Sequence, residues 1–126
     1  MKEQEFLICK HCGNIAVKVI DRGPKLVCCG EEMSVMKANT QDAAQEKHVP
    51  VVKVDGNRLE VTIGSVEHPM TAEHHIAFIF VQTEKGGMKK VLPVDGKPKA
   101  TFCLDDDKAI AVYEYCNLHG VWKLDL

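Results

Sequence analysis

Residues 75–83 read HIAFIFVQT, and this stretch decides the fold class. Its apolar residues would fall on both faces of an extended chain, so we expect a central strand covered on both sides. Upstream, in RLEVTIGSV (residues 58–66), Leu59, Val61 and Ile63 alternate with polar residues, which predicts a strand with one face in water. The turn at residues 55–57, Asp-Gly-Asn, joins this strand to VPVVKV (residues 49–54) as a hairpin.

Three more short apolar stretches follow the central strand. They are MKKVLPV, KATFCL and KAIAVYEY, at residues 88–94, 99–104 and 108–115, and turn-forming residues separate them. Six or seven short strands of this kind predict a mainly β protein built as an antiparallel sandwich. Residues 37–47, KANTQDAAQEK, are polar and predict a linker with one helical turn around residues 42–45. We therefore expect a small domain over residues 1–37 and the sandwich over residues 38–126.

Charge and hydropathy narrow the function classes. The chain has 16 Lys and Arg against 18 Asp and Glu, a net charge of −2. No basic run is present, which argues against nucleic acid as a partner. No apolar stretch reaches the roughly 18 residues of a membrane span, and MKEQEFLICKHCG at the start lacks the apolar core of a secretion signal. We expect a cytoplasmic protein, in which six cysteines indicate metal ligation or redox chemistry.

Four cysteines gather near the N-terminus as Cys9-x2-Cys12 and the adjacent pair Cys28-Cys29. The residues between them, GNIAVKVIDRGPKLV, predict a hairpin whose first strand holds Ile15, Val17 and Val19 and whose turn lies at residues 22–24. Four thiolates suit zinc or iron, and the spacing does not separate the two metals. Two disulfides are the alternative, but one between adjacent cysteines would be strained. Adjacent cysteines should also distort a tetrahedral site, and we expect His11 to be exposed.

Five other histidines lie at strand ends or in loops, and Cys116 lies close to one of them in EYCNLHG (residues 114–120). They could converge at one end of the sandwich as a second metal site. The alternative is a set of scattered surface histidines and one packed cysteine. Cys103, in the apolar stretch ATFCL, is expected to be a core residue with a packing role. The five histidines are His48, His68, His74, His75 and His119.

Several motifs together resemble one known family, the two-iron superoxide reductases called desulfoferrodoxins. The motifs are CKHCGN, LVCCGEEM, AAQEKHVP, GSVEHPM, EHHI and YEYCNLHGVW, in this order over nearly the whole chain. The N-terminal block is similar to desulforedoxin and the remainder to neelaredoxin. The resemblance implies that the sandwich is immunoglobulin-like.

The resemblance also implies two iron sites. The first is a distorted tetrahedral iron, with zinc as the alternative metal, held by Cys9, Cys12, Cys28 and Cys29. The second is a catalytic iron held by a square of four imidazoles, with the Cys116 thiolate on its axis. The four imidazoles are those of His48, His68, His74 and His119. The position after the third histidine is commonly aromatic in the family and is His75 here, so His75 is the alternative to His74, since adjacent strand residues face opposite ways.

The activity implied is the one-electron reduction of superoxide to hydrogen peroxide, with re-reduction by rubredoxin or a similar donor, in a homodimer. Lys47 would attract superoxide and organise the water that protonates the product, and Glu46 could occupy the sixth position of the oxidised iron. A pair of solvated linker charges is the alternative for these two residues. Three other functions stay open at this point: an electron carrier that uses the four-cysteine iron alone, a zinc-stabilised binding module, and a superoxide dismutase.

Overall fold

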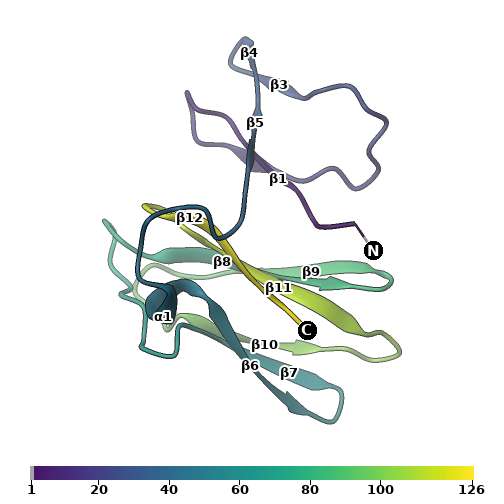
Figure 1. Cartoon of the computed structure of the whole chain (residues 1–126), viewed down its shortest axis with the longest axis vertical. Helices are drawn as coiled ribbons and strands as arrows, with labels where there is room; N and C mark the ends of the chain where they lie inside the picture. The colour runs from purple at the N-terminus through teal and green to yellow at the C-terminus, as the bar shows by residue number, and fades with distance from the viewer. Residues whose placement is uncertain (1) are drawn as a thin grey trace. The chain divides into compact units, whose positions relative to one another are not determined.

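The computed structural model describes residues 2–126, which divide into two compact units (Figure 1). One unit extends to Lys37, and the other runs from Ala38 to Leu126. Among the described residues, no helix has the length and the apolar character needed to cross a bilayer.

The larger unit is a sandwich of two antiparallel sheets (Figure 1). One sheet has the order β10-β7-β6 and the other the order β12-β11-β8-β9. The mainly β, immunoglobulin-like sandwich predicted from the sequence is confirmed. The strands are β6 (Pro50–Asp55), β7 (Arg58–Ile63), β8 (Ile76–Thr83), β9 (Gly86–Val91), β10 (Lys99–Cys103), β11 (Ala109–Cys116) and β12 (Gly120–Asp125).

Hydrophobic alternation places the core between the sheets. In β7, Leu59, Val61 and Ile63 are buried and the intervening side chains are exposed, as the sequence pattern predicts. Strand β8 is buried along most of its length and lies between β11 and β9, which confirms its central position. The buried apolar cluster also includes Phe102, Val112 and the metal-ligand candidate Cys116. The sheet core therefore extends directly to the candidate catalytic site.

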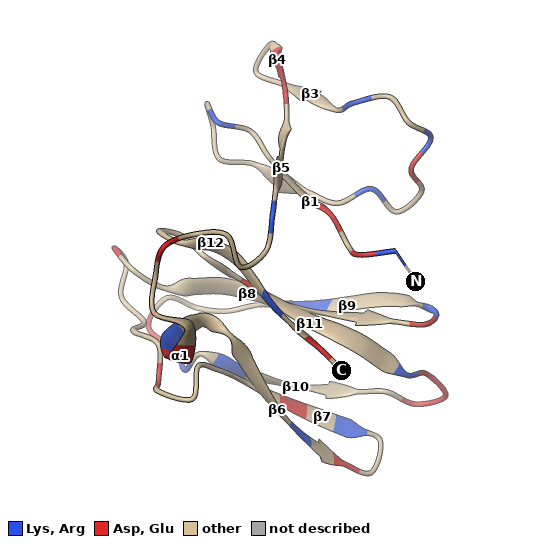
Figure 2. Cartoon of the chain, viewed as in Figure 1, with Lys and Arg blue, Asp and Glu red and all other residues tan. Residues whose placement is uncertain are grey.

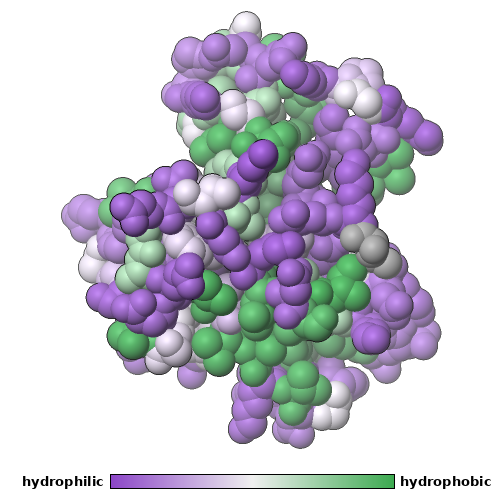
Figure 3. Space-filling model, in the orientation of Figure 1, coloured by the Kyte–Doolittle hydropathy of each residue, from purple (hydrophilic) through white to green (hydrophobic). Residues whose placement is uncertain are grey.

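The surface of the sandwich is mixed in charge and polarity. Acidic and basic segments are interspersed over its strands, and both signs occur side by side on α1 (Gln45–His48) (Figure 2). Figure 3 shows hydrophobic atoms on the face over β6, the strand that exposes Val51 and Val54. Because the two signs of charge are mixed over the described part of the sandwich, this surface does not present an electrostatic field of one sign.

Three local features differ from the sequence predictions. The helical turn lies at residues 45–48, three residues later than expected, so it includes His48. Strand β12 was not predicted; it pairs with β11 from Cys116↔Gly120 onward, which makes residues 117–119 a hairpin turn. The prediction that Cys103 is a core residue is wrong, because Phe102 occupies the inward position of β10 and the alternation turns Cys103 outward.

Over its described residues, the smaller unit contains five short strands: β1 (Phe6–Ile8), β2 (Ile15–Ala16), β3 (Val27–Cys28), β4 (Glu31–Glu32) and β5 (Ser34–Met36). Strand β1 pairs with both β2 and β5, and β3 pairs with β4. The predicted hairpin between the cysteine pairs is therefore wrong. Residues 17–26 form a loop instead, in which the Asp21 carboxylate accepts hydrogen bonds from the Gly23 amide (2.8 Å) and the Lys18 amine (3.1 Å). These local bonds replace cross-strand pairing.

Candidate metal centres

The four N-terminal cysteines converge on one point. Their sulfur atoms all lie within 4.8 Å of one another. Four sulfurs placed 2.3 Å from a central ion would be about 3.8 Å apart along the edges of a tetrahedron. The measured distances of 3.7 Å between Cys12 and Cys28 and 4.0 Å between Cys28 and Cys29 fit that geometry. The described cysteines are all free thiols, so the disulfide alternative finds no support in this structure.

The backbone conformation at Cys29 allows the adjacent cysteines, Cys28 and Cys29, to face the same ion. Cys29 has φ of +53°, in the left-handed region that residues other than glycine seldom adopt. This conformation turns the Cys29 side chain to the same side as that of Cys28. Two neighbouring residues can thus bind a single ion. The left-handed backbone at Cys29 therefore takes up part of the distortion that an adjacent pair would impose on a tetrahedral site.

The four cysteine thiols differ in pKa. The backbone amide of Cys12 is the main cause that lowers the pKa of Cys9, to about 6. The neighbouring thiols, first that of Cys12, raise the pKa of Cys29 to about 12. Asn14 donates its backbone amide to Cys12 Sγ (3.5 Å) and its side-chain amide to Cys28 Sγ (3.7 Å). The group therefore needs a cation to hold four thiolates together. His11 is exposed, as predicted, and pairs with Glu31.

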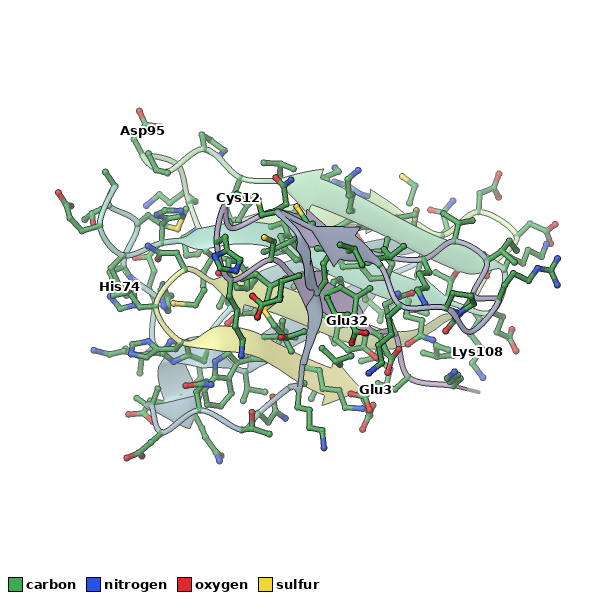
Figure 4. The ribbon with its side chains drawn as sticks, turned by 90° about the horizontal axis from the view of Figure 1, so that it is seen from above. Glu3, Cys12, Glu32, His74, Asp95 and Lys108 are labelled. Carbon is green, nitrogen blue, oxygen red and sulfur yellow. The ribbon has the colours of Figure 1, made fainter. Side chains whose placement is uncertain are left out.

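The second group lies at one end of the sandwich, where Figure 4 shows His74. Four imidazoles form a closed square in which neighbouring rings are nearly perpendicular. The ring centroids are 4.7 Å apart for His48–His68 and 4.6 Å for His68–His74. They are 5.2 Å apart for His74–His119 and 4.9 Å for His48–His119. His48 and His74 lie across the square at 6.4 Å with an interplanar angle of 30°.

Backbone carbonyls set the tautomers of two of these rings. His48 Nδ1 lies 2.7 Å from the Ala44 carbonyl, and His68 Nδ1 lies 2.7 Å from the Pro69 carbonyl. A carbonyl only accepts, so each Nδ1 carries the hydrogen and each neutral ring presents a bare lone pair at Nε2. These two Nε2 atoms face each other at 3.3 Å. Two lone pairs at this distance repel unless a cation lies among them, so the site fits a metal ion.

Burial favours the neutral, metal-binding form of the imidazoles. Desolvation is the main cause that lowers the pKa of His48, of His74 and of His68, the last to about 4. His74 Nε2 is buried and has no hydrogen-bond partner among the described residues. An unpaired buried nitrogen is costly, and a metal bond would satisfy it.

Cys116 and His119 come from the turn between β11 and β12. Cys116 is buried, and its Sγ lies 3.8 Å from His119 Nδ1. Its sulfur also lies within 4.8 Å of the ligand atoms of His48, His68 and His74. Burial raises the pKa of the Cys116 thiol, while the backbone amides of Leu118 and His119 lower it. A cation in the site would favour the thiolate further.

The remaining candidates lie around this square. His75 does not join the group; its Nδ1 lies 2.9 Å from the Thr71 carbonyl. Glu46 and Lys47 are exposed on α1, directly before His48. The charge of Lys47, which directly precedes His48 on α1, contributes to lowering the pKa of both His48 and His74.

Two residues that support the candidate ligands were not predicted from the sequence. Trp122 packs against His48, with ring centroids 5.0 Å apart, and its indole N–H donates to the His119 carbonyl at 3.1 Å. Asn117 binds the loop that carries His74. The motif YEYCNLHGVW contains both residues, but their roles depend on contacts that only the folded chain makes.

Comparison with known proteins identifies the family. Residues 2–36 match the desulfoferrodoxin N-terminal domain, and residues 40–125 match the desulfoferrodoxin domain. The chain belongs to the desulfoferrodoxin family. It is 46% identical over 123 residues to the desulfoferrodoxin of Nitratidesulfovibrio vulgaris, a match that covers 98% of this chain and 97% of that protein.

Solved structures of relatives have the same fold. The superoxide reductase of Treponema pallidum aligns with a TM-score of 0.83 and 42% identity, covering 98% of this chain and 100% of that one. The superoxide reductase of Giardia intestinalis aligns with a TM-score of 0.50 and 35% identity, covering 64% of this chain and 99% of that one. The prediction of two iron ions is confirmed by the family and by the two ligand groups.

Proposed function

We propose that this chain is a superoxide reductase that converts superoxide to hydrogen peroxide at the histidine–cysteine centre. The closed square of imidazoles with the Cys116 sulfur beside it carries the proposal. Four neutral imidazoles and one thiolate would hold an iron ion and would leave it accessible to a small anion. The square would be formed by His48, His68, His74 and His119.

Each of the two units would hold one of the two iron ions. Residues 1–37 form the desulforedoxin-like domain, in which Cys9, Cys12, Cys28 and Cys29 hold one iron. Residues 38–126 form the neelaredoxin-like catalytic domain. The arrangement of the four sulfurs supports the first assignment, and the lone pairs of His48 and His68 support the second.

The iron of the catalytic domain, when bound, supplies the single electron that superoxide takes up. The side chains control what reaches it. Lys47 directly precedes His48 on α1, and its positive charge attracts the superoxide anion and orders the water that delivers protons. Glu46 lies beside Lys47 on α1, and its carboxylate would be available as a further ligand for the oxidised metal. Each turnover consumes one superoxide, one electron and two protons and yields one hydrogen peroxide.

The electron donor and the assembly are part of the same proposal. Rubredoxin or a protein of similar potential returns the electron, and the chain acts as a homodimer in the cytoplasm. The free thiols of all six cysteines support a reducing compartment. Exposed apolar side chains on the smaller unit, such as Val19 at 92% and Ile20 at 65% exposure, support its use in dimer contacts.

A stoichiometry experiment tests the reaction. A superoxide pulse is applied to the anaerobically reduced, iron-loaded protein, and hydrogen peroxide and oxidised iron are both counted. One peroxide and one oxidised iron for each superoxide are expected. One peroxide for every two superoxides without net iron oxidation would instead identify a dismutase. No reaction from the iron-loaded protein would leave an electron carrier.

A further inference from the structure

Asn117 makes three hydrogen bonds to the loop that carries His74. Its Oδ1 accepts from the backbone amide of His75 at 2.9 Å. Its Nδ2 donates to the carbonyl of Glu73 at 2.9 Å. Its own backbone amide donates to the carbonyl of His75 at 3.2 Å. These bonds hold the residues immediately before and after His74, so they bracket this ligand.

The orientation of the His74 ring depends on hydrogen bonds to its loop, whereas the rings of His48 and His68 are oriented directly. The His48 and His68 rings are oriented by their own Nδ1 atoms on backbone carbonyls. Within residues 2–126, the hydrogen bonds recorded for His74 all involve its backbone, which is bonded to Thr71. The direction of the His74 ring is therefore set by the position of its loop.

Asn117 also follows Cys116 directly in the chain. The residue that holds the His74 loop thus belongs to the turn that supplies both Cys116 and His119. We propose that Asn117 is a positioning residue that fixes His74 relative to Cys116 in the catalytic centre. It couples an equatorial ligand to the axial one across 42 positions of sequence.

The amide is suited to this task because it offers a donor and an acceptor on one short side chain. Aspartate keeps the acceptor for the His75 amide but loses the donor for the Glu73 carbonyl. Alanine loses both side-chain bonds and keeps only the backbone bond. The chain offers a matched control in Asn39, whose side chain accepts from the Lys123 amide (2.8 Å) and donates to the Lys123 carbonyl (3.3 Å).

The test compares Asn117→Ala, Asn117→Asp and Asn39→Ala in the full iron-loaded chain. The readouts are iron loss to a chelator and the visible spectrum of the oxidised histidine–cysteine centre. Asn117→Ala should weaken iron binding at this centre by about 10–100-fold and shift its absorption band. Asn117→Asp should have a smaller effect of the same kind, and Asn39→Ala should leave the spectrum unchanged. The four-cysteine centre should be unaffected throughout.

A double-mutant cycle distinguishes positioning from general destabilisation. In a His74→Ala background, Asn117→Ala should weaken iron binding no further, because the ligand it positions is already missing. A full additional effect in that background, or a wild-type spectrum in Asn117→Ala itself, would overturn the inference. The inference rests on the proposed metal site but not on superoxide as substrate. Normal iron binding without superoxide reduction would refute the proposed function alone.

Discussion

Cys116 Sγ and His119 Nδ1 lie 3.8 Å apart in the hairpin turn between β11 and β12. The pairing Cys116↔Gly120 closes this turn, so three residues of separation bring the thiol and the imidazole to the same side. The strand that presents Cys116 is part of the buried core, and Cys116 is 0% exposed. The position of Cys116, the candidate axial ligand, is therefore fixed by the sandwich.

Replacing this sulfur should remove the reaction and spare the other metal site. Cys116→Ser should abolish superoxide reduction, because a serine hydroxyl does not provide the thiolate that the site requires. The four-cysteine centre should keep its iron and its spectrum. Cys103→Ser, at an exposed position of β10, is the matched control and should retain full activity. Superoxide reduction by Cys116→Ser at the wild-type rate would contradict the axial role.

The choice between two adjacent histidines leads to a second prediction. His74→Ala should weaken iron binding at the catalytic centre by at least tenfold, because the buried Nε2 atom is lost. His75→Ala should bind iron normally, since the His75 ring nitrogen is directed to the Thr71 carbonyl. Iron content after dialysis against a chelator gives the comparison. The reverse result would exchange the roles of the two residues.

The sequence predicts the strands of the sandwich well because burial of one face imposes a regular alternation. Leu59, Val61 and Ile63 show this alternation, and all three are buried in β7. Cys103 shows its limit: apolar neighbours suggested burial, but the face that a residue takes depends on register. Phe102 pairs with Leu59 and fills the inward position, which leaves Cys103 on the outside.

Motifs predict the candidate metal ligands, but they do not predict the residues that support them. Cysteine and histidine spacing is a local property of the chain. The bonds between Asn117 and the His74 loop join residues 42 positions apart, and the Trp122 ring reaches His48 only in the folded sandwich. The hairpin expected between the cysteine pairs was wrong for a similar reason, because β1 provides a better partner for β2.

Lys47 should accelerate the encounter with superoxide through its charge. Lys47→Ala should lower the second-order rate constant by about tenfold at low ionic strength, and the difference should shrink as salt is added. Lys108→Ala removes the same net charge at the opposite end of the sandwich, where Figure 4 shows Lys108 far from His74. Pulse radiolysis at several salt concentrations measures both variants. Equal losses in the two variants would assign the effect to net charge instead of to the position of Lys47.

Gly64 should be essential for the placement of α1. It has φ of +84°, and an added Cβ would lie 2.3 Å from the Val66 carbonyl oxygen and 2.8 Å from that of Glu46. The Glu46 carbonyl in turn accepts from the Val66 amide at 2.9 Å. Gly64→Ala should cost roughly 2–5 kcal/mol of stability and weaken iron binding at the catalytic centre.

Gly56 provides the control for backbone strain alone. It has φ of +62° in the β6–β7 turn, and a Cβ there would meet open space. Gly56→Ala should cost roughly 1–2 kcal/mol and leave iron binding unchanged. Denaturant titration and iron content measure the two effects. Equal costs for the two variants would show that the contact with α1 is unimportant.

Asn14 should raise the reduction potential of the four-cysteine centre. Its side-chain amide lies 3.7 Å from Cys28 Sγ and lowers the pKa of that thiol, although neighbouring thiols raise it overall. A donor that stabilises thiolate charge favours the more negative, reduced state of the centre. Asn14→Ala should therefore shift the potential to more negative values, and Asn14→Asp, which adds a negative charge, should shift it further. A redox titration followed by visible absorption gives the order, and an unchanged or more positive potential in Asn14→Ala would refute the role of this hydrogen bond.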